Sequence, residues 1–272
     1  MGSIGSYNVS DSHRDVQSEV DRLRTQALLS WEGEAQKLIL LGLNDGMNVV
    51  ELGSGPGFIT EQLLGMLPSS RITALEIDPG LIQRSKDNLK EIGGERVEYA
   101  EASITDTRLP ENHFDFAVAR LIFQHLPEPT AAAKEVFRIL KPGGKLVILD
   151  IDDAVWGLAD PDVPEMDMIF EKFAAAQAAQ GGNRFIGRRL WRIMHSTGFQ
   201  NLKMDAVVAQ SDELGIEAFM PQIDPDRLLP LQKAGLISQA EIEQIRSARE
   251  IFLSAENPFI LTIMLLICGE KG

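Results

Sequence analysis

The sequence predicts an α/β fold: a seven-stranded, mostly parallel sheet with helices on both faces and a helical cap. From residue 47 to 151, short apolar runs alternate with stretches of helical spacing, and a glycine cluster follows the first run. Strand–helix alternation favours a parallel sheet, because each crossover helix covers one of its faces. Apolar residues make up 44% and charged residues 24% of the chain, so a globular core is expected.

The N-terminal region is predicted to be a polar tail followed by two helices. The first 12 residues are rich in Ser and Gly, which is typical of a mobile tail. Apolar residues then recur with helical spacing from Val16 to Ala27 and predict the first helix. A second helix is predicted over residues 31–41, ending near Gly42.

Five apolar runs separated by three helical stretches form the predicted core. The strands are expected at 47–53, 72–77, 96–100, 114–119 and 145–151, and the helices at 59–67, 80–91 and 130–140. The turn Pro142-Gly143-Gly144 is expected to end the last of these helices and to launch the strand at residue 145.

The second half of the chain predicts helices more than strands. We expect an amphipathic helix over 163–180, a helix over 187–199 stopped at Gly198, a strand over 202–208, an acidic helical region over 212–255 and a fully buried strand over 259–268. No linker separates two domains, so we predict a single domain over residues 1–272. Its parts are an N-terminal helical cap segment over 1–42, a core over 43–151, cap insertions with the end of the core over 152–255, and a final antiparallel strand over 256–272.

The charge balance excludes several classes of partner. Forty acidic residues against 26 basic ones give a formal net charge of −14. Such a surface repels phosphate backbones and anionic lipid, so we expect neither nucleic acid nor membrane as a partner. A secretory signal and a bilayer-spanning apolar run are both absent from the sequence, and the single cysteine excludes an intrachain disulfide. We therefore expect a soluble, cytoplasmic protein.

The glycine cluster ELGSGPG is the sharpest motif in the chain. Gly53, Gly55 and Gly57 let the backbone turn tightly and approach a ligand at the start of a helix. A dinucleotide fingerprint requires glycine where Phe58 stands, and no P-loop motif occurs. Glu51, just before the cluster, would repel pyrophosphate and would suit an ammonium or sulfonium charge.

A second carboxylate follows the next predicted strand. Glu76 lies 19 residues after Gly57, the spacing at which an acidic residue accepts hydrogen bonds from ribose hydroxyls. Asp78 is the alternative, but Asp78-Pro79 is typical of a helix N-cap with proline at the first helical position. We therefore assign the ribose to Glu76.

Four motifs in order resemble the class I S-adenosylmethionine-dependent methyltransferases: ELGSGPG, LEIDP, LPENHFDFAVARLIFQHLPEP and EVFRILKPGGKLVILDID. The resemblance is greatest to the ubiquinone/menaquinone-biosynthesis-like small-molecule group and is strong over about residues 20–151. It implies a Rossmann-like fold, S-adenosyl-L-methionine as cofactor, and a cofactor-binding core over 43–151. It also implies that Gly53, Ser54 and Gly55 pass under the methionyl part of the cofactor, with Glu51 near its ammonium.

The resemblance implies roles for further residues around the cofactor. Gln26, on a helix with the pattern R-L-x-x-Q, would close over the cofactor, and Ile77 would pack against adenine. Ser103 and Ile104 would lie at the adenine amino group, and the carbonyl group of Ala119 would face the cofactor ammonium. Arg120 and Gln124 would lie beside the methionyl carboxylate or the substrate. Ser103 departs from the family pattern, in which an aspartate often stands at this position.

Methyl transfer is an in-line displacement that needs alignment and, for a hydroxyl or carbon acid, a general base. The candidates are His125, after the fourth strand, and one of Asp150, Asp152 and Asp153 at the end of the fifth, because ligands bind at the carboxyl ends of parallel strands. Of these three carboxylates we favour Asp152. We expect no metal, since the further Asp-Asn pair of metal-dependent catechol-type enzymes is missing. Arginines at 184, 188, 189 and 192 are expected on the solvated side of a helix or paired with acidic residues.

The expected function is methyl transfer to O, N or C of an apolar small molecule, a substrate of natural-product biosynthesis. Aromatic and methionine residues available to line the substrate pocket in the cap are Trp31, Trp156, Met166, Met168, Phe170, Phe173, Phe185, Phe219 and Met220. Two alternatives stay open: a methyltransferase-like cyclase or isomerase that keeps its cofactor unspent, and a non-catalytic cofactor-sensing protein. The sequence leaves a homodimer open as well.

Overall fold

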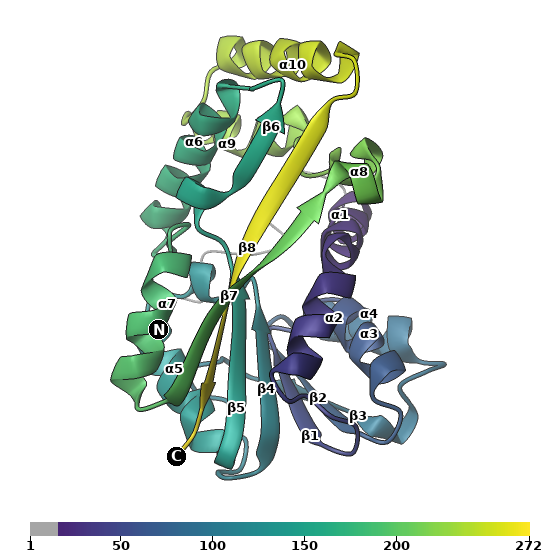
Figure 1. The fold of residues 1–272 in the computed structure, drawn as a ribbon, viewed down its shortest axis with the longest axis vertical. Helices are drawn as coiled ribbons and strands as arrows, with labels where there is room; N and C mark the ends of the chain where they lie inside the picture. The colour runs from purple at the N-terminus through teal and green to yellow at the C-terminus, as the bar shows by residue number, and fades with distance from the viewer. Residues whose placement is uncertain (1–15) are drawn as a thin grey trace.

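The computed structural model describes residues 16–272 as a mixed eight-stranded sheet flanked by helices (Figure 1). The strand order is β3-β2-β1-β4-β5-β8-β6, and β7 pairs with the other edge of β8. The parallel strands are β1 (Asn48–Leu52), β2 (Arg71–Glu76), β3 (Val97–Glu101), β4 (Phe114–Arg120) and β5 (Leu140–Asp150). The predicted fold class is confirmed, whereas the predicted polar tail lies outside the described residues.

Successive apolar residues of the parallel strands face opposite sides of the sheet. Val50 packs on the side covered by α5 (Pro129–Ile139) and α7 (Gly187–Thr197). Val49 packs on the side covered by α3 (Phe58–Met66) and α4 (Pro79–Leu89). This is why these strands are apolar almost throughout: both faces of a covered parallel sheet are buried.

The two predicted N-terminal helices are confirmed as α1 (Val16–Leu29) and α2 (Trp31–Leu40). They join the side of the sheet that α3 covers, through residues such as Val20 and Leu38. Gly42, just beyond α2, has φ of +106°, a backbone conformation that favours glycine.

The last strand joins the core sheet to the cap. β8 (Phe259–Glu270) pairs antiparallel with β5 through residues 265–270, and with the short β6 (Gly157–Asp160) through residues 259–262. β7 (Gln200–Gln210) pairs with its opposite edge. The sheet therefore continues past the carboxyl ends of the parallel strands, as Figure 1 shows.

Two expectations about this region were wrong. The sheet has eight strands instead of the predicted seven, and β6 is the additional one. Its stretch contains a single large apolar residue, Leu158, so the sequence did not predict a strand there. The strand over 259–268 is not fully buried, since several residues of its first half are half-buried. The beginning of this half pairs with β6 in the cap.

The cap has its own small apolar cluster. α6 (Glu165–Ala179) packs there against α9 (Leu229–Lys233) and α10 (Gln239–Ser254) through Ile169, Leu228, Leu231, Ile237, Ile242 and Ile245. The predicted helical region over 212–255 is interrupted: it consists of α8 (Ser211–Leu214), α9 and α10, with 3-10 turns η5 (Ile216–Phe219) and η6 (Pro225–Leu228) between them.

The turn Pro142-Gly143-Gly144 lies within a strand instead of before it. Leu140 already pairs with Phe114, and Lys145 pairs with Phe116, so the residues between form a bulge in β5. Gly143 has φ of +79°, and a Cβ on Gly144 would lie 2.8 Å from the carbonyl oxygen of Lys141. Glycine is therefore required at the bulge, and the strand begins earlier than predicted.

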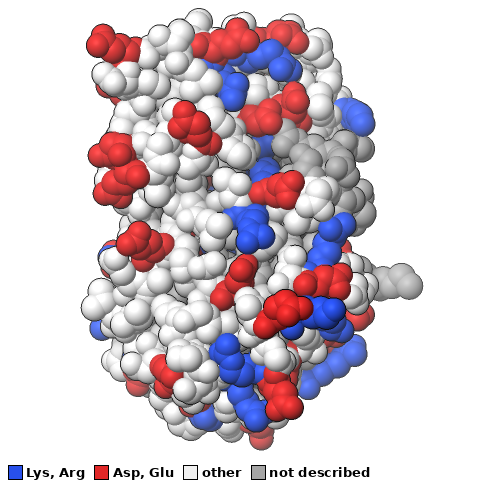
Figure 2. All heavy atoms as spheres, turned by 90° about the vertical axis from the view of Figure 1, so that its right-hand side faces the viewer, with Lys and Arg blue, Asp and Glu red and all other residues white. Residues whose placement is uncertain are grey.

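Charged side chains are mixed on the surface. On the face that Figure 2 shows, described lysines and arginines are interspersed with acidic side chains rather than gathered into one patch. None of the described helices is long and apolar enough to cross a membrane.

Candidate functional site

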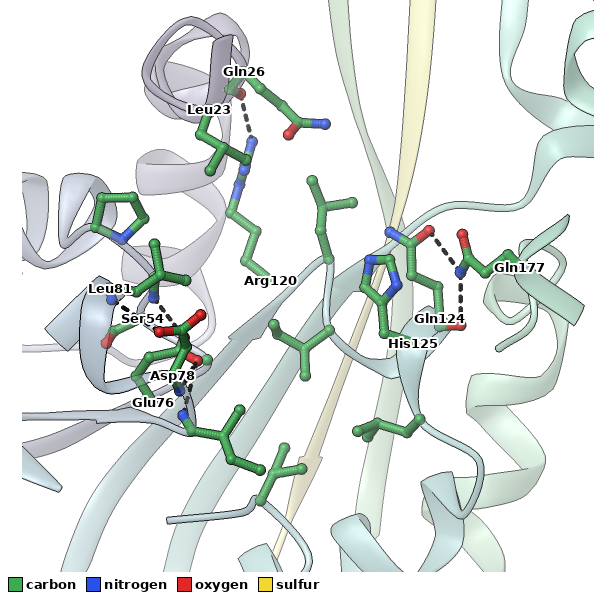
Figure 3. A pocket seen from close by; sticks show the side chains of 18 of the residues that line it. Leu23, Gln26, Ser54, Glu76, Asp78, Leu81, Arg120, Gln124, His125 and Gln177 are labelled. Carbon is green, nitrogen blue, oxygen red and sulfur yellow. Dashed lines mark hydrogen bonds between the residues drawn. The ribbon is translucent and has the colours of Figure 1, made fainter. Parts of the chain in front are cut away.

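A cavity of about 960 Å³ lies at the carboxyl ends of β1, β2 and β4, between the core and the cap. Ligands of open α/β sheets bind at this edge. Figure 3 shows two groups of polar side chains: Ser54, Glu76 and Asp78 on one side, and Gln124, His125 and Gln177 on the other. The first group comes from the core, whereas the second involves the cap helix α6.

The glycine loop presents bare backbone to the cavity. Gly53, Gly55 and Gly57 have φ of +69°, +54° and +85°, and Gly57 precedes the first residue of α3. A Cβ on Gly53 would lie 2.2 Å from Cδ1 of Ile122, whereas a Cβ on Gly55 would meet no atom within 4 Å. Gly53 therefore permits close packing, and Gly55, which lines the cavity, leaves room for a ligand.

Glu51 is a buried carboxyl group in the cavity wall. It is only 4% exposed and accepts a hydrogen bond from the Thr60 hydroxyl. Burial raises the pKa of Glu51 to about 8, and the negative charge of Glu76 adds to this, against the effects of Thr60 and Arg120. A cationic ligand group beside Glu51 would stabilise its ionised form.

Glu76 lies at the end of β2 and lines the cavity. Its carboxylate accepts hydrogen bonds from three backbone N–H groups: Gly55 at 2.9 Å, Ile77 at 2.8 Å and Asp78 at 3.0 Å. Asp78 instead caps α4, accepting from the backbone N–H of Gly80 at 2.7 Å. The predicted N-cap is therefore confirmed, and Glu76 is the carboxylate held at the glycine loop.

An apolar wall continues from Glu76. Ile77 is 43% exposed and lies at the cavity with Leu81 and the buried Ile104. The Ser103 hydroxyl is 2.8 Å from that of Thr105, which also lines the cavity and which sequence reasoning missed. The wall suits a flat heterocycle with a few polar atoms.

Arg120 connects the core to the N-terminal helices across the cavity. Its Nε and Nη2 donate to the Glu34 carboxylate at 2.8 and 3.0 Å, and Nη2 donates to the carbonyl oxygen of Gln26 at 2.9 Å. Figure 3 shows Arg120 reaching toward the helix that carries Gln26. Sequence reasoning missed Glu34, which is 1% exposed, although an acidic residue among the apolar positions of α2 was a signal.

Ala119 differs from the other residues expected around the cofactor. It is fully buried within β4 and is not among the residues that line the cavity. The cavity lining does include the expected Gln26, Glu51, Gly53, Ser54, Gly55, Glu76, Ile77, Ser103, Ile104, Arg120, Gln124 and His125.

The 3-10 turn η3 (Phe123–His125) places Gln124 and His125 at the cavity. Burial lowers the pKa of His125 to about 4, and the positive charge of Arg184 contributes. The imidazole is therefore neutral at neutral pH. The carbonyl oxygen of Gln124 accepts from Nε2 of Gln177 at 2.8 Å and from the backbone N–H of Asn183 at 2.6 Å.

The structure does not bring Asp152 to the cavity. Its carboxylate pairs with Arg188, through Nε at 2.7 Å and Nη2 at 2.6 Å, and it is not among the residues that line the cavity. Asp153 pairs in the same way with Arg184, whose Nη2 donates at 3.0 Å. The arginines at 184 and 188 are thus paired with acidic residues, as predicted, and those at 189 and 192 are exposed.

The cap half of the cavity combines apolar and polar side chains. Its lining includes the apolar Leu126, Pro127, Phe173, Ala176, Leu229 and Pro230, and the polar Glu128, Gln177, Gln180, Arg184, Asp226 and Arg227. Of the nine aromatic and methionine residues expected to line it, Phe173 alone does so among the described residues. The guanidinium carbons of Arg184 and Arg227 lie 5.6 and 5.4 Å from the centre of its ring.

Metal-dependent chemistry and a cysteine nucleophile find little support in the described part of the chain. Across residues 16–272, no group of three or more His, Cys, Asp or Glu side chains is arranged to hold a metal ion. Cys268 lies buried in β8, and burial raises the pKa of its thiol to about 11. A thiol in that state is a poor nucleophile.

Comparisons with known proteins agree with this geometry. Residues 50–148 match a family model described as a methyltransferase domain. The ubiquinone/menaquinone biosynthesis C-methyltransferase of Shewanella woodyi is 28% identical over 111 residues, which cover 40% of this chain and 44% of the relative. The match thus spans less than half the length of this curated relative.

Solved structures show the same fold. The phosphoethanolamine N-methyltransferase 2 of Haemonchus contortus, in complex with phosphomonomethylethanolamine and S-adenosylhomocysteine, has a TM-score of 0.57 and 16% identity, covering 89% of this chain and 53% of that one. The [4+2]-cyclase SpnF has a TM-score of 0.55 and 19% identity, covering 89% of this chain and 83% of that one. Two different activities are therefore built on this fold.

Proposed function

We propose that this chain, whose residues 50–148 match a methyltransferase domain model, is a class I S-adenosylmethionine-dependent methyltransferase that transfers a methyl group to O, N or C of an apolar small molecule. The observation that supports this most directly is one cavity with Glu51 and Glu76 in its core half and a neutral, half-buried His125 beside the apolar groups of its cap half. The names of the curated relatives make a quinone-type ring the first acceptor to test, ahead of secondary metabolites of similar character.

The core half of the cavity fits S-adenosylmethionine. The space beside Gly55 accommodates the methionyl chain, and the desolvated Glu51 suits its ammonium group. Glu76, at the end of β2, suits the two ribose hydroxyls, and the exposed side chain of Ile77 suits a face of adenine. Arg120, held by Glu34, is the nearest match for the methionyl carboxylate.

The cofactor supplies an activated methyl group and its own leaving group. The residues of this chain therefore align the acceptor, exclude water and manage a proton. Apolar groups such as Leu126 and Phe173 exclude water from the cap half. The neutral imidazole of His125 accepts a hydrogen bond, and then the proton, from a hydroxyl or other acidic acceptor group.

The direct test is incubation with methyl-labelled S-adenosylmethionine and pools of apolar acceptors, beginning with prenylated hydroxyquinones, followed by mass spectrometry. We expect a product heavier than the acceptor by one methyl group. An isomeric product with unspent cofactor would replace methyl transfer with the cyclase alternative. Tight cofactor binding with no change in any acceptor would favour the cofactor-sensing alternative.

Single variants separate binding from chemistry. Glu76→Ala should weaken binding of S-adenosylhomocysteine about tenfold or more in calorimetry, because the ribose loses its acceptors. His125→Gln should lower kcat about a hundredfold while leaving that affinity nearly unchanged. The matched control is His195→Gln on α7, which is exposed and distant from the cavity lining and should leave kcat unchanged.

A further inference from the structure

The turn η3 lies between the two halves of the cavity and is conformationally constrained. Leu121, two residues before it, has φ of +57°, a region that residues with a side chain rarely adopt. The side chain of Ile122 occupies the place that a Cβ on Gly53 would need. The turn that carries Gln124 and His125 is therefore packed directly against the glycine loop.

The backbone donors of η3 are satisfied from a neighbouring strand. The first N–H groups of a helical turn have no partner within it, and the preceding residue, Ile122, offers no side-chain cap. Asp150, at the end of β5, supplies the acceptor: its Oδ2 accepts the Gln124 N–H at 3.1 Å, and its Oδ1 accepts the Ile151 N–H at 2.9 Å. Asp150 is fully buried, and its carboxylate caps η3 from the neighbouring strand β5.

The other backbone polar group of Gln124 is held by the cap. The carbonyl oxygen of Gln124 accepts from the Gln177 side chain on α6 and from the Asn183 backbone N–H. The backbone of Gln124 thus lies between a core carboxylate and the cap, one residue before His125. A shift of this backbone would displace His125 relative to both halves of the cavity.

We propose that Asp150 is a positioning residue of the acceptor site: its carboxylate caps η3 and thereby fixes Gln124 and His125 between the glycine loop and the cap. The catalytic consequence rests on the proposed function, whereas the cap itself does not. Asp152, two residues further on, pairs with Arg188 away from the cavity and has no such role.

The first test compares Asp150→Asn with the matched control Asp152→Asn. The amide keeps only one acceptor oxygen for the two backbone N–H groups of Gln124 and Ile151 and turns its N–H₂ group toward the other, so Asp150→Asn should lower kcat about ten- to a hundredfold with the affinity for S-adenosylhomocysteine within about twofold. The control should keep kcat within about twofold, since its partner Arg188 is largely exposed to solvent. In a His125→Gln background, Asp150→Asn should lower kcat far less than in the wild type, because both changes act on the same step.

The second test needs no activity and no variant. Burial raises the pKa of Asp150 to about 7, against the effects of the backbone N–H groups and of Arg184, the charged side chain that acts on it. The amide resonance of Gln124 in wild-type protein should therefore shift with a midpoint near pH 7, distinct from His125, whose pKa lies near 4.

The outcomes separate the positioning role from the proposed function. A Gln124 resonance that does not move near pH 7, or full kcat in a folded Asp150→Asn variant, would overturn the positioning role. If Asp150→Asn does not fold, the wild-type titration decides. A clear Gln124 transition in a protein that methylates no acceptor would retain the cap and reject the proposed function.

Discussion

Replacing Glu51 with glutamine should raise the stability of the ligand-free protein at alkaline pH. The substitution keeps the side-chain shape and a partner for Thr60 but removes a carboxyl group that is buried near Glu76. The pKa of Glu51 rises from 4.5 in the unfolded chain to about 8 in the folded protein, mainly through burial. Between these values the folded state retains a proton that the unfolded state has lost, so stability falls as the pH rises.

The size of the effect follows from the two pKa values. Between about pH 5.5 and about pH 8.5, this proton linkage costs the wild type about 3 kcal/mol of unfolding free energy, which the variant does not lose. The same variant should bind S-adenosylhomocysteine more weakly, because the ligand ammonium loses its counter-charge. Stability and binding are therefore expected to change in opposite directions.

Urea unfolding of ligand-free protein at both pH values measures this directly. The decline between them should be about 3 kcal/mol larger for the wild type than for Glu51→Gln. The control is Glu91→Gln, at an exposed position, which should follow the wild type. If the wild type and Glu51→Gln decline in parallel, the carboxyl group of Glu51 is not desolvated, and the reasoning about its role beside a cation fails with it.

Three further predictions concern the loop, the ion pair across the cavity and the thiol. Gly53→Ala should lower the unfolding free energy in urea by about 1–3 kcal/mol and abolish S-adenosylhomocysteine binding, because the added Cβ clashes with the side chain of Ile122. Gly55→Ala should weaken binding with a smaller loss of stability, because no atom lies in the way of its Cβ. Glu34→Gln should lower the unfolding free energy by about 3–5 kcal/mol, because it leaves Arg120 without its buried carboxylate; an unchanged urea midpoint would contradict this. Cys268 should not react with a thiol reagent in the native protein and should react on unfolding, so rapid labelling of the folded chain would refute its burial.

Sequence patterns predicted the core well because its signals are local. The glycine loop depends on the backbone freedom of Gly53 and Gly55, and the cap of α4 depends on Asp78 next to a proline. Such features need only a few neighbouring residues, so a short motif is enough to identify them. The short strand β6 was missed because it has no such local signal. Its four residues form a strand only by pairing with β8, which lies about a hundred residues further along the chain.

The roles of acidic side chains were harder to predict. Three carboxylates lie within four residues at the end of β5, namely Asp150, Asp152 and Asp153, and sequence alone does not distinguish them. In the folded chain, Asp152 and Asp153 meet arginines, whereas Asp150 meets the backbone N–H of Gln124. Each partner lies far away in sequence, so the assignment depends on how the strands and α7 pack.

The sequence by itself determined the order of strands and helices in the core, the glycine loop and the carboxylate of Glu76, because alternating hydrophobicity and glycine conformations act over short distances. The tertiary structure decided which side chains meet: Arg120 with Glu34 across the cavity, and Asp150 with the turn that carries His125. Burial and the distance between charges determine whether a carboxyl group is ionised, paired or capping a turn, and both exist only once the sheet and its cap have packed together.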